Sequence, residues 1–279
     1  MKSLMIQGTS SGAGKTTLVT ALCRIFSDMG FSVAPFKAQN MSNFSYVEKN
    51  FEISRAQALQ ALGARCEITP HLNPILLKPL GNYYSNVYVH GQKIAKMHAK
   101  QYYHKFALTK GLKIATKSLK YLQKNYDIVI LEGAGSPAEI NLQKFDIANM
   151  KIAEQACSPV LLVSDIDRGG SFASMVGTLS LLENKHQNLV KGFIMNKFRG
   201  DVNLLKPGFE IIKEKTHRSV FGVIPMFDLN LPEEDSLNSK AKDLEWTKKN
   251  IDTIESEIEK LSQLVYKNLN MKEIKRMVK

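Results

Sequence analysis

Residues 8–17, GTSSGAGKTT, combine three glycines with a lysine that is followed by two threonines. Glycines let backbone N–H groups turn inward around phosphates, a lysine can bridge the outer phosphates, and a threonine hydroxyl can bind Mg²⁺. The segment therefore predicts a phosphate-binding loop for ATP, in which Lys15 contacts the outer phosphates and Thr16 contacts Mg²⁺. The predicted nucleotide contacts are Thr9, Ser10, Ser11, Gly12, Ala13, Gly14, Lys15, Thr16 and Thr17.

This loop departs from the commonest spacing of its motif. Counting back from Gly14 puts Thr9 where the first glycine usually stands, and Gly8 lies one residue earlier. A partition-type ATPase would carry a second lysine at position 10, and Ser10 occupies that position. The loop therefore weighs against a partition-type ATPase.

Three further polar residues follow short apolar runs. Glu132 ends the run 126–132, YDIVILE, and Lys37 follows the run that ends at residue 35. Ligand sites of parallel sheets lie at the carboxyl ends of their strands, so we expect Glu132 to bind Mg²⁺ there, together with Thr16. Lys37 would neutralise a phosphoryl group during transfer. Asn196, after the run 192–195, can hydrogen-bond a purine edge, but asparagine is also common after strands.

The elements that must position these residues follow from the alternation of apolar runs with longer helical patterns. The strand candidates are residues 4–7, 32–35, 128–131, 160–164, 192–195 and 220–224. Strands that are nearly continuous apolar runs and alternate with helices predict a doubly wound α/β fold with a mostly parallel sheet, of the P-loop NTPase type. Residues 66–92 are rich in proline and glycine, and we expect them to form an irregular excursion on the substrate side.

A net charge of +12 suggests nucleic acid as a possible partner, but the spacing of the lysines argues against this. Five of them share a helical rhythm with apolar residues and lack the interleaved aromatics that stack on bases. They are Lys110, Lys113, Lys117, Lys120 and Lys124, and the apolar residues are Leu108, Leu112, Ala115, Leu119 and Leu122. We therefore expect an amphipathic helix with a solvated lysine face and no nucleic-acid partner.

The chain also lacks the patterns of a membrane or exported protein. No stretch approaches the ~20 apolar residues that cross a membrane, and the N-terminus shows no secretion signal. Cys23, Cys66 and Cys157 have no metal-binding spacing. We expect a cytoplasmic protein with reduced thiols and no membrane contact.

Two parts are predicted along the chain: a nucleotide-binding domain over residues 1–237, and a linker with a helical tail over residues 238–279. The polar segment 228–243 resembles a linker. The tail carries an apolar stripe that must cover either the flank of the domain or a partner. The stripe consists of Ile251, Ile254, Ile258, Leu261 and Val265.

Longer phrases of the sequence resemble the ATP-dependent amidoligase part of the cobyric acid synthases, over about residues 3–237. The phrases are APFKAQNMS (34–42), EISRAQ (52–57), NPILLKP (73–79), VHG (89–91), EGAGSPAEINL (132–142), DIANM (146–150), DIDRGG (165–170), NKFRGD (196–201) and LPEEDS (231–236). The related dethiobiotin synthetases and cobyrinic acid a,c-diamide synthases share the loop, the second lysine and the acid, but not these phrases.

The resemblance implies a corrinoid substrate, adenosylcobyrinic acid a,c-diamide, whose carboxylates would be activated as acyl phosphates and amidated by ammonia to give cobyric acid. It assigns catalysis to Lys15, Lys37 and Glu132 and supports Asn196 as an adenine contact. The positions that would face the corrinoid or the acyl phosphate are Gln39, Asn40, Asn141, Asp146 and Arg168. The alternatives are a nucleotide-binding scaffold without activity and a ligase of either related type.

Cobyric acid synthases of this type normally continue into a glutaminase domain with a cysteine nucleophile, and no cysteine here lies in a fitting motif. Residues 251–279 resemble the helical end that follows the glutaminase in full-length enzymes. This likeness suggests that the glutaminase was excised from the middle of the chain. We therefore expect ammonia from a separate glutaminase subunit, which the tail helps to dock, or from solution. Relatives often pair subunits, which suggests a homodimer.

Overall fold

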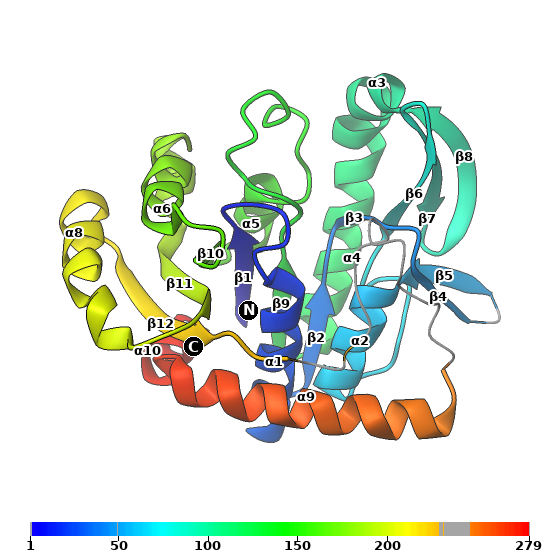
Figure 1. The fold of residues 1–279 in the computed structure, drawn as a ribbon. Helices are drawn as coiled ribbons and strands as arrows, with labels where there is room; N and C mark the ends of the chain where they lie inside the picture. Colours follow the sequence, from blue (N-terminus) through cyan, green and yellow to red (C-terminus); the bar gives the residue numbers. More distant parts are fainter. Residues whose placement is uncertain (1, 49, 229–230, 232–245, 279) are drawn as a thin grey trace.

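The computed structural model describes residues 2–48, 50–228, 231 and 246–278. Within them, a six-stranded sheet runs in the order β12-β11-β10-β1-β9-β2, with parallel neighbours throughout (Figure 1). Its strands are β1 (Lys2–Gly8), β2 (Val33–Phe36), β9 (Ile128–Glu132), β10 (Val160–Asp165), β11 (Val190–Phe198) and β12 (Ser219–Pro225). The six predicted strands and the parallel α/β fold are confirmed.

Both faces of this sheet are buried, because successive residues of a strand point to opposite sides. Met5 of β1 belongs to a core with α4 (Leu112–Asn125), α5 (Met150–Ala156), α6 (Ser171–Ser180) and α8 (Lys206–Thr216). Leu4 and Ile6 belong to a second core, with α1 (Lys15–Asp28), α9 (Lys248–Asn268) and α10 (Met271–Met277). Two buried faces explain why the central residues of these strands form nearly continuous apolar runs.

Residues 66–92 are not the irregular excursion that the sequence predicts, because most of them form strands. A second sheet has the order β3-β6-β7-β8 and consists of β3 (Gln39–Met41), β6 (Ile75–Gly81), β7 (Tyr84–Val89) and β8 (Gln92–His98). The β6–β7 turn places Asn82 and Tyr83 at φ 50° and 62°, as hairpin turns require. Proline has no N–H group to donate to a neighbouring strand. Pro79 is compatible with β6 because only Ile75, Leu76 and Leu77 pair with β3. Gly81 and Gly91 thus lie at hairpin turns, with φ values of 85° and 80°, rather than in an unstructured segment.

A short antiparallel hairpin, β4 (Ser45–Glu48) with β5 (Phe51–Ser54), leads directly into α2 (Arg55–Ala64). The Ser54 hydroxyl accepts a hydrogen bond from the Ala56 N–H, which caps the first turn of this helix. In Figure 1, α2 lies beside β2, and the hairpin lies at the edge of the molecule, below the second sheet. Helix α2 therefore brings side chains from a separate part of the chain to the carboxyl edge of the central sheet, where Gln60 reaches Glu132.

The predicted lysine-faced helix is confirmed from Leu112 onward, where α4 buries Leu119 and Leu122 and exposes its lysines. The preceding turns are α3 (Ala99–Gln101) and a π-helix, η1 (Tyr102–Gly111). Because a π-helix has more residues per turn than an α-helix, the 3.6-residue rhythm fails there, and Leu108 is 38% exposed. None of the described helices combines the length and the apolar composition that crossing a bilayer needs.

The apolar stripe of the tail covers the flank of the domain itself. Ile254 and Ile258 pack with Leu59 of α2, and Leu261 and Val265 join the core that includes α1. Arg24 of α1 forms an ion pair with Glu255. These side chains are thus already covered, which is contrary to their expected use as a docking face. The predicted linker, apart from Asp228 and Leu231, and the predicted domain boundary lie outside the described residues.

Replacing Leu261 by alanine should lower the free energy of unfolding by about 2–5 kcal/mol, because the side chain is fully buried against the core. Denaturant unfolding measures the change. The control is Asp252→Ala on the exposed side of the same helix, which should change stability by less than ~0.5 kcal/mol. Equal stability of the two variants would contradict the packing of the tail.

Candidate functional site

The glycine loop between β1 and α1 has the backbone that a phosphate cradle needs. Gly12 and Gly14 have φ values of 70° and 93°, a left-handed conformation that glycine adopts without strain. A Cβ atom on Gly14 would lie 2.1 Å from Nδ2 of Asn196, and one on Gly8 would lie 2.7 Å from the Ser10 carbonyl oxygen. Gly8, one residue before the usual first glycine, is therefore a position where this loop has no room for a side chain.

Side chains from neighbouring strands brace the loop. Asn196, at the carboxyl end of β11, donates from Nδ2 to the Ala13 carbonyl at 2.9 Å. Lys197 donates to the Gly12 carbonyl at 2.8 Å and pairs with Asp165 of β10 at 2.7 Å. Thr9 donates to Ser164 at 3.1 Å. The structure thus places Asn196 against the loop itself, and the bracing role of Lys197 and Asp165 is one that the sequence reasoning did not assign.

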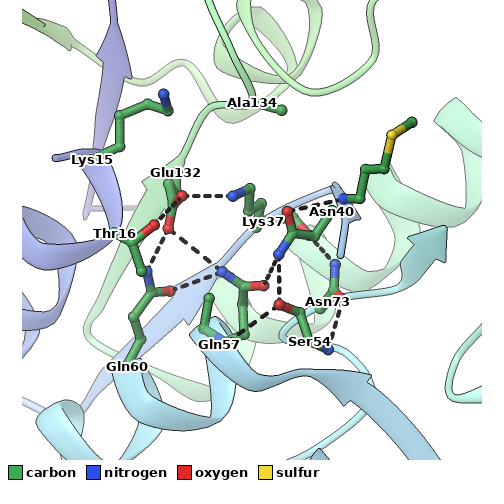
Figure 2. A network of polar contacts seen from close by, with 12 residues as sticks. Lys15, Thr16, Lys37, Asn40, Ser54, Gln57, Gln60, Asn73, Glu132 and Ala134 are labelled. Carbon is green, nitrogen blue, oxygen red and sulfur yellow. Dashed lines mark hydrogen bonds and ion pairs between the residues drawn. The ribbon is translucent and has the colours of Figure 1, made fainter. Parts of the chain in front are cut away.

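The two predicted catalytic lysines lie on different sides of the site (Figure 2). Lys15, at the first turn of α1, curls back so that its ammonium group donates to the Ser10 carbonyl at 3.0 Å. Lys37, just after β2, points instead at Glu132. Both side chains are nearly withdrawn from water. Two buried ammonium groups beside a glycine loop suit a ligand with several negative charges.

Glu132 is the hub of the polar contacts. It ends β9, which lies between β1 and β2, so its carboxylate reaches residues that follow both neighbours. Its Oε1 accepts a hydrogen bond from the Thr16 hydroxyl at 2.8 Å and forms an ion pair with Lys37 Nζ at 2.6 Å. The exposed side-chain fractions of Lys37 and Glu132 are 3% and 0%. Low local dielectric strengthens such a pair and makes it costly to break.

A second group of amides reaches Glu132 from α2. Gln60 Nε2 donates to Oε2 of the carboxylate, and Gln57 Nε2 lies 3.5 Å from the same oxygen. Asn40 donates to Ser54 Oγ and lies 3.5 Å from Gln57 Oε1 (Figure 2). Sequence reasoning missed both glutamines as site residues. Their signal was present, because two glutamines three residues apart share one face of a helix that is otherwise rich in alanine and leucine.

The five predicted substrate residues do not form one cluster. Asn40 joins the Glu132 network, and Gln39 accepts a hydrogen bond from the Tyr102 hydroxyl at 2.6 Å. Burial raises the pKa of Tyr102, so this hydroxyl stays protonated and can donate. Arg168 is 69% exposed and lies 3.6 Å from Asp165, beside the glycine loop. Arg168 follows β10, on one side of β1, whereas Asn40 follows β2, on the other side of β1.

Asp146 and Asn141 lie in the long connection that follows β9. Asp146 accepts hydrogen bonds from the N–H groups of Ala148 and Asn149, at 2.7 and 3.1 Å, and so holds the turn before α5. Burial raises the pKa of Asp146. Asn141 is exposed in a turn of the same connection. These contacts give Asp146 a clear structural role, and its contact with substrate stays a prediction.

A nucleoside polyphosphate with Mg²⁺ fits this donor set. The N–H groups at the start of α1 and the two ammonium groups suit phosphates, and hydroxyl and carboxylate oxygens are the hard ligands that Mg²⁺ prefers. Thr16 and Glu132 supply such oxygens 2.8 Å apart, beside the loop. The fold and this site together define a P-loop nucleotide-binding protein. More narrowly, the chain belongs to the CobQ/CobB/MinD/ParA nucleotide binding domain family, whose profile matches residues 4–238.

Curated relatives are similar over the same region. A protein named probable cobyric acid synthase from Thermococcus kodakarensis is 53% identical over 240 residues, which are 85% of this chain and 49% of the relative. The cobyric acid synthase of Aliivibrio fischeri is 52% identical over 244 residues, 86% of this chain and 48% of the relative. The chain thus spans about half the length of these relatives.

Solved structures show a more distant likeness. The MinD cell division protein of Aquifex aeolicus has a TM-score of 0.47 and 16% sequence identity, and the match covers 95% of this chain and 93% of that chain. At this identity the likeness concerns the fold alone.

Gly14→Ala should weaken nucleotide binding at least tenfold, because the new methyl group would collide with Asn196 and displace the loop. Gly30→Ala is a matched control: Gly30 is also left-handed, at φ 88°, but has nothing within 4 Å of an added Cβ. It should cost about 1–2 kcal/mol of stability and leave nucleotide affinity unchanged. Fluorescent-nucleotide titration measures both variants, and equal affinities would contradict the role of the loop.

Lys37→Met and Glu132→Gln should each lower the free energy of unfolding by about 3–5 kcal/mol, because each breaks a buried ion pair. In the double variant, the decrease in the free energy of unfolding should be smaller than the sum of the two single decreases by at least ~1 kcal/mol. The exposed pair Lys185–Glu154, at 3.2 Å, is the control, and the same substitutions there should couple by less than ~1 kcal/mol. Urea unfolding tests the prediction, and additive losses at Lys37 and Glu132 would refute it.

Proposed function

We propose that this chain uses ATP and Mg²⁺ to amidate side-chain carboxylates of a corrinoid, converting adenosylcobyrinic acid a,c-diamide to cobyric acid in cobalamin biosynthesis. The observation that carries the proposal is the joining of Lys37, Glu132 and Thr16 beside the phosphate loop. The name cobyric acid synthase, borne by relatives about half identical to this chain, supports the choice of substrate. The reaction would place the chain among the carbon–nitrogen ligases.

The proposed reaction has two steps that balance. A carboxylate oxygen of the substrate attacks the γ-phosphorus of ATP, ADP leaves, and an acyl phosphate forms. Ammonia then attacks the acyl carbon, inorganic phosphate leaves, and the surplus proton passes to solvent, which gives the amide. Phosphoryl transfer depends chiefly on positioning and on stabilising charge, so side chains that supply fixed positive charge account for most of the catalysis.

The residues of the chain divide this work. Lys15 and the loop N–H groups would bind the phosphates. Asn196, which braces the loop, would contact the adenine. Lys37 would stabilise the negative charge on the phosphoryl group in transfer. Thr16 and Glu132 would hold Mg²⁺, which supplies further positive charge at the phosphates when it is bound. The ion pair between Glu132 and Lys37 is already formed in this structure. The carboxylate and the ammonium group are therefore both in place before the ligand binds.

An exposed apolar side chain follows Asn40 in the chain, because Met41 is 47% exposed. An apolar side chain next to a buried amide suits a macrocycle whose edge carries carboxylates and amides. We propose that Gln39, Asn40, Asn141, Asp146 and Arg168 contact the corrinoid or the acyl phosphate. Ammonia from a glutaminase or from solution, and pairing into a homodimer, stay predictions.

Incubation of the chain with ATP, Mg²⁺, ammonium or glutamine, and the corrinoid diamide should produce corrinoids with additional amides, counted by mass spectrometry. Lys15→Met should reduce corrinoid-dependent ATP turnover at least ~100-fold, because a donor to the transferring group is lost. Lys113→Met, a change on the exposed face of α4, is the matched control and should leave turnover intact. Nucleotide binding without corrinoid-stimulated turnover or amide formation would instead favour a non-catalytic scaffold.

A further inference from the structure

Two glutamine side chains of α2 are completely buried beside Glu132. Gln57 and Gln60 have no exposed surface, and they lie three residues apart on one face of the helix. A buried amide is costly unless its N–H groups and its oxygen find hydrogen-bond partners. Partners for this pair come from the carboxylate and from residues on the substrate side of the site.

The hydrogen bonds of this group can run in only one direction. A carboxylate accepts and does not donate, so Gln60 must present its Nε2 to Oε2 of Glu132. Its Oε1 is then left to accept from Gln57 Nε2, at 3.3 Å. Gln57 in turn presents Oε1 to Asn40 Nδ2, at 3.5 Å. A flip of either glutamine amide would set like groups against each other, so the carboxylate fixes both amide orientations.

The two carboxylate oxygens of Glu132 thereby have different hydrogen-bonding partners. Oε1 faces Thr16 and Lys37, while Oε2 faces Gln60 and Gln57 (Figure 2). The terminal torsion of a glutamate side chain is soft and roughly two-fold, so packing alone defines the carboxylate plane weakly. Hydrogen bonds from buried amides on one oxygen fix that plane and so fix the direction in which the other oxygen points.

We infer that Gln57 and Gln60 are positioning residues that orient the Glu132 carboxylate so that Oε1 faces the phosphate loop, and that they thereby set the affinity for Mg²⁺. The inference rests on the proposed role of Glu132 in Mg²⁺ binding and deepens it. Groups that orient a metal ligand typically change metal affinity 10–100-fold when they are removed. The direct bond from Gln60 makes it the stronger of the two.

The test measures how Mg²⁺ strengthens binding of a fluorescent ATP analogue, with no corrinoid present. Gln60→Met keeps the length of the side chain but removes its donor, and it should raise the half-saturating Mg²⁺ concentration at least tenfold. Gln57→Met should raise it about threefold, since its contact with the carboxylate is longer. Affinity for the nucleotide without Mg²⁺ should stay within about twofold of the original, because Glu132 would act through the metal.

Gln123→Met is the matched control, since Gln123 of α4 bonds to the Ala156 carbonyl rather than to the site, and it should leave every value unchanged. A folded Gln60→Met variant with the original Mg²⁺ midpoint would overturn the inference. If thermal melting shows that Gln60→Met is unfolded, the Mg²⁺ midpoint of Gln57→Met is measured instead. A midpoint equal to that of the unaltered chain would then overturn the inference. Absence of any Mg²⁺ effect in the unaltered chain would instead refute the metal role of Glu132, which separates failure of the proposed function from failure of the inference.

Discussion

The carboxylate of Glu132 is withdrawn from water, and a charge in that position is stable only when cationic and hydrogen-bonding groups surround it. This constraint explains why separate parts of the chain converge on one point. Lys37 arrives from the end of β2, Thr16 from the first turn of α1, and the two glutamines from α2. The same partners that stabilise the buried charge also orient it, so the stability of this region and the geometry of the site share one set of contacts.

The parallel sheet makes that convergence possible. Strand β9 lies between β1 and β2, and its carboxyl end therefore meets the phosphate loop on one side and Lys37 on the other. On the other side of β1, β10 and β11 brace the loop through Asp165, Lys197 and Asn196. The tail packs across α1 and α2, the two helices that carry Thr16 and the glutamines. The packing of α9 against α1 and α2 thus helps to hold the helices that carry the site residues.

Prediction succeeded where residue types mark one structure directly and failed where the same residue types fit more than one structure. The glycine loop and the strand ends can be read from short runs, because backbone freedom and burial on two faces leave direct marks on residue type. The second sheet was missed because the prolines and glycines of residues 66–92 indicated an irregular segment, although β6, β7 and β8 pair as consecutive hairpins. The rhythm of η1 was misread because a π-helix breaks the 3.6-residue period. The two glutamines escaped notice because an uncharged side chain on a helix looks solvated until its burial is known.

By itself, the sequence determined the class of fold, the phosphate loop, and the presence of Lys37 and Glu132 at strand ends, because each depends on residue types within one short segment. Only the tertiary structure decided that Lys37 and Thr16 share a single oxygen of Glu132. It also decided that α2 supplies the opposing amides and that the stripe of the tail lies inside the protein. Those features are distances between segments far apart in sequence, and such distances are set by the packing of the whole chain.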